Sequence, residues 1–239
     1  MNWEAFFALH RDLPREGPGA PEDVAWALSM AETPDQALIL DAACGPGADT
    51  EALARQRPQA SILGVDTTPH FIEEARRRLH WTGPNVSFRV ARMEEVPGSF
   101  DLIWCADAVY FMGVAECLKI WRPRLAERGV VAFSEPAWFT DKPAAELERF
   151  WQEYPAMTNV AGIEAQIADA GFRVVATRIV SDAGWEAYYG PMQTRIDMLR
   201  QGRVDPDLAE VLADGEKEAM IWRQYRDQFG YVLFVVRPA

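Results

Sequence analysis

Short, fully apolar stretches alternate with amphipathic stretches through the middle of the chain. Short apolar runs bounded by turn residues are typical of buried strands, and apolar residues spaced three and four apart are typical of helices. The pattern predicts strands at residues 37–43, 61–66, 86–92, 100–106 and 129–135, and helices at residues 48–56, 69–79 and 114–122. Because strands that are apolar on both faces must be covered on both faces, this alternation predicts a parallel sheet with helices on each side.

Both ends of the chain are predicted to add helices to this core. Two helices precede the first strand, at residues 2–10 and 21–31, and the second begins well because Pro21 suits a first helical position. The later part of the chain predicts a helix, a strand, a pair of helices and a closing strand, at residues 160–170, 172–180, 184–200, 207–229 and 230–238. The paired helices therefore form an insertion between the last two strands.

Composition and charge narrow the class of protein. The chain has 239 residues and a net charge of −12, and an acidic surface repels the phosphates of nucleic acids. Its three cysteines and three histidines are scattered, so we expect reduced thiols and no metal site. No apolar run approaches the roughly 20 residues of a membrane helix, and the first ten residues do not resemble a signal peptide. We expect a cytoplasmic protein that binds neither nucleic acid nor membrane.

A glycine-rich turn, "ILDAACGPGADT", follows the first predicted strand. Such a turn lies at the ligand-binding edge of an open α/β sheet, and it can serve dinucleotides or S-adenosylmethionine. A dinucleotide site requires G-x-G-x-x-G against the pyrophosphate, but the corresponding residues here are Ala43, Gly45 and Ala48. Asp41 would repel a pyrophosphate and attract an ammonium group, and Asp66, which ends the second strand, can accept hydrogen bonds from ribose hydroxyls. Together these residues favour S-adenosylmethionine.

Four successive motifs resemble those of class I S-adenosylmethionine-dependent methyltransferases: "ILDAACGPGADT", "ILGVDTTPHFIEEARRR", "VSFRVARMEEVPGSFDLIWCADAVYFM" and "RPRLAERGVVAFSEPAWF". The flanking stretches "LPREGPGAPED", "TDKPAAELERFW", "WEAYYGPMQTRI" and "YRDQFGYVLFVV" resemble a bacterial small-molecule subgroup of this family, type 11/25-like and related to ubiquinone and menaquinone methyltransferases. The resemblance implies a Rossmann-like three-layer α/β sandwich whose seven-stranded, mostly parallel sheet has the order 3-2-1-4-5-7-6. It also implies one domain over residues 1–239, with a lid (1–35), a cofactor-binding core (36–139) and substrate-side helices with a closing strand hairpin (140–239).

The resemblance also implies which residues bind the cofactor. Residues of the glycine-rich turn would hold its methionine part, Asp66 its ribose, and Arg92 with Met93 its adenine, while a lid arginine would reach its carboxylate. Ala43 replaces the usual first glycine, and Arg92 replaces the usual acid, so Arg92 stacks on the adenine or pairs with a neighbouring glutamate. The expected cofactor-binding residues are Arg15, Asp41, Ala43, Gly45, Gly47, Asp66, Thr67, Arg92, Met93 and Cys105.

Candidate catalytic and acceptor-binding residues follow from their place after the strands. Methyl transfer from a sulfonium needs positioning more than a nucleophile, but an acceptor with a mobile proton needs a base. Asp107, Tyr110 and Glu135 are candidates for that base, although Tyr110 could equally form an aromatic wall and Asp107 a helix cap. Candidates for an acceptor pocket, with core packing as the alternative for the aromatic ones, are Glu16, Trp138, Trp185, Tyr188 and Tyr189.

The sequence therefore predicts a methyltransferase that acts on a small-molecule acceptor by in-line displacement, with S-adenosylhomocysteine as the second product. A homodimer is compatible with the sequence. Three alternatives remain at this point: a non-catalytic S-adenosylmethionine-binding protein, an NAD-dependent oxidoreductase, and a nucleic-acid base methyltransferase. Against the oxidoreductase, this chain has alanine at position 48 where the third glycine is expected. Against the base methyltransferase, it has "CADAVY" where an Asn/Asp-Pro-Pro-aromatic motif is expected.

Overall fold

The computed structural model describes residues 2–239, and these fold around one central β-sheet. Five parallel strands form most of it: β1 (Leu38–Ala42), β2 (Ser61–Asp66), β3 (Val86–Val90), β4 (Phe100–Cys105) and β5 (Leu125–Trp138). β8 (Phe229–Pro238) pairs antiparallel with β5, and β7 (Phe172–Ile179) pairs antiparallel with β8. The order β3-β2-β1-β4-β5-β8-β7 confirms the predicted topology, because β8 and β7 are the seventh and sixth long strands of the chain.

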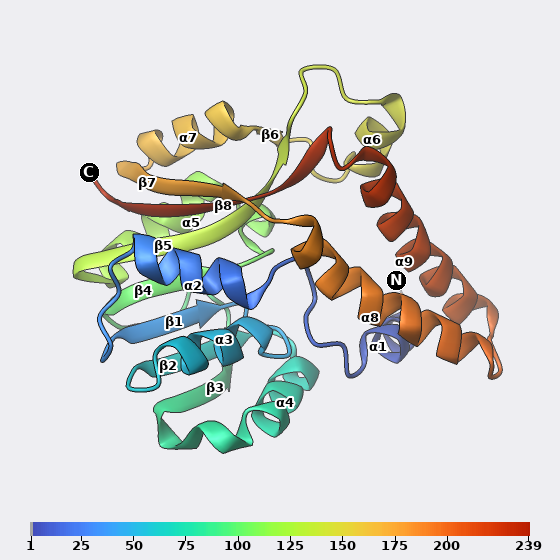
Figure 1. The fold of residues 1–239 in the computed structure, drawn as a ribbon, viewed down its shortest axis with the longest axis horizontal. Helices are drawn as coiled ribbons and strands as arrows, with labels where there is room; N and C mark the ends of the chain where they lie inside the picture. Colours follow the sequence, from blue (N-terminus) through green and yellow to red (C-terminus); the bar gives the residue numbers. More distant parts are fainter. Residues whose placement is uncertain (1) are drawn as a thin grey trace.

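Helices cover both faces of the sheet, as predicted (Figure 1). On one face, α2 (Pro21–Met30) and α3 (Ala48–Gln56) pack on the apolar side chains of β1, β4, β5 and β8. On the other face lie α5 (Val114–Trp121) and α7 (Val160–Asp169), while α4 (Pro69–Arg78) packs along β2 and β3. The central strands β1, β4 and β8 are almost fully buried, which explains their continuous apolar sequence, whereas the outer strands β3 and β7 are largely half-buried or exposed.

A third group of helices lies beyond the carboxyl ends of the strands (Figure 1). It consists of α1 (Trp3–His10), α8 (Asp182–Arg200) and α9 (Pro206–Tyr225), which pack against one another, and α6 (Ala145–Phe150) adjoins it. These helices share a core of their own, built around stacked tryptophan and tyrosine rings. The beginning and the end of the chain are thus brought together above the edge of the sheet at which ligands bind in such folds.

The structure extends the predicted elements in two places. β5 begins at Leu125 rather than at residue 129. Leu125 pairs with Phe100 and Val130 with Leu102, and a register shift between these pairs accommodates Gly129 within the strand. A two-residue strand, β6 (Thr158–Asn159), pairs with the end of β5. Neither β6 nor α6 was predicted. Among residues 2–239, no helix combines the length and apolar character needed to cross a membrane.

Candidate active site

One cavity of about 660 Å³ opens between the carboxyl ends of β1–β4 and the helices α1, α8 and α9. Its walls come from the glycine-rich turn after β1, the ends of β2 and β3, the loop after β4, and the segment that links α1 to α2. The structure brings twelve of the predicted site residues to this cavity: Arg15, Glu16, Asp41, Ala43, Gly45, Asp66, Thr67, Arg92, Met93, Asp107, Tyr110 and, from α8, Tyr188.

The turn after β1 is built from three residues in the left-handed region of backbone conformation. Gly45 has φ = 51°, Gly47 has φ = 90°, and Ala43, where a glycine was expected, has φ = 62°. A left-handed alanine costs about 1–2 kcal/mol, so the chain keeps this turn despite the missing glycine. Gly47 does not line the cavity; it caps α3, and a Cβ there would meet Ala75 of α4 at 3.1 Å.

Two carboxyl groups flank this turn. Asp41 is almost fully buried and accepts a hydrogen bond of 2.5 Å from Thr50 Oγ1. Burial, with a smaller contribution from the charge of Asp49, raises the pKa of the Asp41 carboxyl to about 8. Asp66 accepts from the amide of Gly45 at 3.1 Å and from the amide of Thr68 at 2.8 Å. Within residues 2–239 the Asp41 carboxyl therefore has no cationic partner, whereas the Asp66 carboxyl holds the turn in place.

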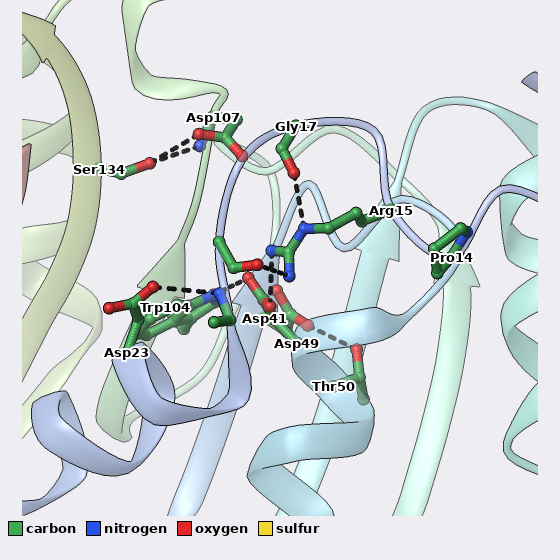
Figure 2. Close-up of polar contacts among 12 residues, drawn as sticks. Pro14, Arg15, Gly17, Asp23, Asp41, Asp49, Thr50, Trp104, Asp107 and Ser134 are labelled. Atoms are coloured by element: carbon green, nitrogen blue, oxygen red, sulfur yellow. Dashed lines mark hydrogen bonds and ion pairs between the residues drawn. The ribbon is translucent and has the colours of Figure 1, made fainter. Parts of the chain in front are cut away.

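Arg15 ties the segment between α1 and α2 to the body of the protein (Figure 2). Its guanidinium donates to the carbonyls of Gly17 and Gly19 and, at 2.9 Å, to Asp49 Oδ1 in α3. Asp49 in turn accepts from Trp104 Nε1 at 3.1 Å. These contacts occupy Nε and both terminal nitrogens of Arg15, so in this structure Arg15 holds the segment between α1 and α2 against α3.

The same segment is held from the side of α8. The amide of Gly19 donates to the carbonyl of Gly184 at 3.1 Å, and a Cβ on Gly184 would meet the backbone of Gly19 at 3.4 Å. Gly17 approaches the Asp107 side chain so closely that a Cβ would lie 2.3 Å from Asp107 Oδ2. Gly17 of "PREGPG" thus permits close approach to the loop after β4, and Gly184 of α8 permits close approach to Gly19 of the same segment.

The residues after β3 and β4 form the far end of the cofactor side. Arg92 is exposed, and its guanidinium pairs with the neighbouring Glu94 and lies 3.9 Å from Glu95. Met93 lines the cavity, and its sulfur lies 4.0 Å from Cys105 Sγ. Cys105 itself is fully buried and does not line the cavity, whereas the next residue, Ala106, does.

The three candidate bases separate into two groups. Asp107 and Tyr110 line the cavity, but Glu135 of β5 is buried away from it and accepts a hydrogen bond of 2.5 Å from Tyr154. Asp107 caps no helix: its amide donates to Ser134 Oγ, and that hydroxyl donates back to Asp107 Oδ1, each over 2.9 Å. Burial raises the pKa of the Asp107 carboxyl to about 7. Asp107 and Asp41 are therefore two carboxyls at the cavity whose pKa values lie near neutral pH.

Glu135→Gln is expected to stabilise the protein more at pH 8 than at pH 5. Burial raises the pKa of Glu135 in the folded protein to about 7 from its ordinary value of 4.5. Between these values the unfolded chain releases the proton first, so stability falls as the pH rises. Because the glutamine amide stays neutral, the variant avoids a loss of about 1–3 kcal/mol in the free energy of unfolding. Its carbonyl oxygen can still accept a hydrogen bond from Tyr154. Thermal melting of both proteins at the two pH values is the measurement; equal shifts would contradict the expectation.

The predicted acceptor-pocket residues also separate. Glu16 and Tyr188 line the cavity, whereas Trp138, Trp185 and Tyr189 do not. Trp185 and Tyr189 are buried in the core of the α8–α9 pair, and Trp138 packs its ring at the edge of the same core, 6.5 Å from Phe229.

Sequence reasoning missed several residues that line the cavity. Three aromatic side chains of α1 line the cavity, His10 and Glu218 also line it, and Asp49 holds Arg15. The missed residues include Trp3, Phe6, Phe7, His10, Asp49 and Glu218. His10 Nδ1 lies 2.6 Å from Glu16 Oε2. Glu218 accepts from Tyr189 at 3.0 Å. α1 and α9 read as ordinary amphipathic helices, so nothing in their local pattern marks these positions.

The fold and the site together define a class of protein. A sheet of this order, a glycine-rich turn after β1, and acids at the ends of β1 and β2 are the arrangement of class I S-adenosylmethionine-dependent methyltransferases. Residues 39–129 match the family model described as "Methyltransferase domain". This segment of the chain belongs to the methyltransferase family, and the curated relatives similar to the chain are methyltransferases.

Curated relatives are similar to part of the chain. The chain is 31% identical to trans-aconitate 2-methyltransferase of Methylobacterium nodulans over 169 residues, which is 69% of this chain and 60% of the relative. It is 38% identical to the enzyme of that name from Afipia carboxidovorans over 122 residues, or 49% of this chain and 45% of the relative. The chain thus spans less than two thirds of the length of these relatives.

Solved structures share the fold over the whole chain. A methyltransferase from Geobacter sulfurreducens in complex with S-adenosylhomocysteine superposes with a TM-score of 0.86 at 20% identity, covering 99% of this chain and 98% of that one. YjhP from E. coli superposes with a TM-score of 0.85 at 20% identity, covering 99% and 100%. The demethylated cofactor is also bound in a similar structure from Thiobacillus denitrificans. These matches lend no support to the oxidoreductase alternative.

Proposed function

We propose that this protein is an S-adenosylmethionine-dependent methyltransferase that moves a methyl group to a small-molecule acceptor. The observation that carries the proposal is the joint cavity, in which the turn after β1 with Asp41 and Asp66 faces Asp107, Tyr110 and Tyr188. A cavity of about 660 Å³ must accommodate the cofactor and the acceptor together, so it favours a small acceptor.

The residues on the turn side fit this cofactor. Asp41, a buried carboxyl with a pKa raised to about 8, gains most from a cation, and the ammonium group of the cofactor would supply one. Asp66 would accept from the ribose hydroxyls while it keeps its bonds to the turn, and Thr67 would lie beside the adenosine. Met93 and Arg92 would border the adenine, with Arg92 free to stack because its charge is already paired with Glu94.

The cofactor, when bound, supplies a methyl group on an activated sulfonium. The chain's own contribution is then to position the acceptor and to exclude water. Arg15 would contribute by holding the segment between α1 and α2 closed, and the aromatic residues of α1 would cover the mouth. Asp107, with a pKa near 7, is the group at the cavity that can take a proton from the acceptor.

The three parts of the chain would divide this work. Residues 1–35 would act as the lid, residues 36–139 would bind the cofactor, and residues 140–239 would shape the acceptor side through α8 and α9. Glu135, Trp138, Trp185 and Tyr189 would support the fold, since none of them lines the cavity.

Two measurements on the purified protein test the function. Calorimetry with S-adenosylmethionine and S-adenosylhomocysteine is expected to show one binding site for each. Incubation with methyl-labelled cofactor and a panel of amines, carboxylic acids and phenols is expected to give a labelled small molecule. Binding without transfer to any member would favour the non-catalytic alternative, and absence of binding would contradict the cofactor as well.

A further inference from the structure

The part of the cavity away from the glycine-rich turn is acidic and aromatic. Glu16, Asp107 and Glu218 line it from three elements, together with Tyr110 and Tyr188. These groups lie close enough to interact: burial, followed by the charges of Glu218, Glu16 and Asp107 among its neighbours, raises the pKa of the Tyr188 hydroxyl. The acceptor side of the cavity is therefore a cluster of carboxyl groups around two phenol rings.

The positive charges that line the cavity already have carboxylate partners. Arg15 is paired with Asp49 and Arg92 with Glu94, while the His10 ring contacts Glu16. Asp107 and Glu218 receive hydrogen bonds only from the neutral hydroxyls of Ser134 and Tyr189 among residues 2–239. The field on the acceptor side thus favours a cation and opposes an anion.

One polar atom on this side points to a ligand that donates hydrogen bonds, and a second, a phenol hydroxyl, can bond a ligand as donor or acceptor. Tyr188 is 5% exposed and lines the cavity, and its hydroxyl has no hydrogen-bond partner within residues 2–239. Glu16 Oε1 is buried and likewise has no partner in that part of the chain, although Oε2 of the same side chain contacts His10. Buried polar groups are normally satisfied, and a carboxylate oxygen can be satisfied only by a donor.

We propose that the acceptor is a small primary or secondary amine, bound in its ammonium form between Glu16, Asp107 and Glu218 and methylated on nitrogen. The proposal rests on the proposed function and names its acceptor class. The aromatic rings of Tyr110 and Tyr188 add attraction for the same cation.

The reaction balances with the groups present. The ammonium gives one proton to the Asp107 carboxylate, which leaves a lone pair on the nitrogen. That lone pair forms the new N–C bond while the C–S bond of the sulfonium breaks, and the electron pair of the broken bond stays on sulfur. The proton passes from Asp107 to solvent, so that the products are the methylated amine and the thioether.

The same charges oppose a polycarboxylate acceptor such as trans-aconitate, for which both curated relatives described above are named. An acceptor of that kind needs unpaired cationic side chains, but the arginines that line this cavity are engaged with Asp49 and Glu94. Like charges placed together cost several kcal/mol. The acceptor class of this chain therefore differs from the one that those names print.

Matched probes test the charge preference. Protein saturated with S-adenosylhomocysteine is titrated by calorimetry at pH 8 with 2-phenylethylamine, 3-phenylpropionate, 2-phenylethanol and trans-aconitate. We expect the amine to bind about tenfold more tightly than its matched acid and alcohol. Equal or tighter binding of an acid or the alcohol, or no amine binding at all, overturns the amine. Methyl transfer to trans-aconitate would overturn the amine but leave the methyltransferase function standing.

A pair of variants on α9 tests the cluster itself. Glu218→Gln keeps an acceptor for the Tyr189 hydroxyl but removes the charge at the cavity, whereas Glu210→Gln removes an exposed charge from the same helix. We expect Glu218→Gln to weaken amine binding about tenfold with cofactor affinity unchanged, and Glu210→Gln to have no effect. Equal amine affinity in the two variants would contradict the proposal. Failure of the unmodified protein to bind the cofactor would instead contradict the proposed function.

Discussion

Replacing Asp66 by alanine is expected to weaken the binding of S-adenosylmethionine by at least about 100-fold. Two ribose hydroxyls would lose a charged acceptor, and hydrogen bonds to charged groups contribute about 1.5–3 kcal/mol each. The variant also releases the amides of Gly45 and Thr68, which Asp66 holds in this structure. The turn after β1 then loses its connection to the end of β2. Calorimetry with S-adenosylmethionine measures the change.

Two further variants separate the loss of the carboxylate from a loss of folding. Asp66→Asn keeps one acceptor oxygen for a turn amide, so its affinity should lie between those of the unmodified protein and Asp66→Ala. Asp169→Ala removes an exposed aspartate at the end of α7 and should change neither affinity nor melting temperature. An Asp66→Ala protein that melts normally and binds the cofactor within about threefold of the unmodified protein would show that Asp66 does not contact the ribose.

The parts of the site that follow directly from a strand could be predicted from the sequence. A residue that ends a parallel strand lies at the ligand-binding edge whatever the rest of the chain does, and Asp41, Asp66 and Asp107 are placed in this way. The same reasoning fails for residues whose side chains point to the other face of the strand. Cys105 ends β4 and Glu135 lies near the end of β5, but the alternation along a strand turns both side chains into the core.

The acceptor side of the cavity could not be predicted in this way, because its residues meet only through tertiary packing. His10 and Glu16 come from the beginning of the chain and Glu218 from its end, and they reach one cavity because α1 packs against α8 and α9. A single polar residue on an amphipathic helix carries no local signal for that meeting. The same packing decides that Tyr188 lines the cavity while its neighbour Tyr189 belongs to the core.

Trp185→Ala is expected to destabilise the protein by about 3–5 kcal/mol, the usual cost of removing a buried aromatic side chain. The Trp185 ring is 3% exposed and stacks on Trp222 with centroids 5.0 Å apart and planes 8° apart. It also lies 5.4 Å from the Tyr231 ring, so its loss opens the core between α8, α9 and β8. Thermal and denaturant unfolding measure the effect.

A second substitution at this position decides whether Trp185 serves the core or the acceptor. Since its side chain does not line the cavity, Trp185→Phe, which preserves a stacked ring, should retain cofactor affinity and the Michaelis constant for an acceptor while it lowers the melting temperature. Trp81→Ala, which removes a half-exposed tryptophan stacked under Arg55, is the control and should cost no more than about 1 kcal/mol. A changed Michaelis constant in a Trp185 variant of normal stability would instead place the ring at the acceptor, and α8 would then bend further into the cavity than this structure shows.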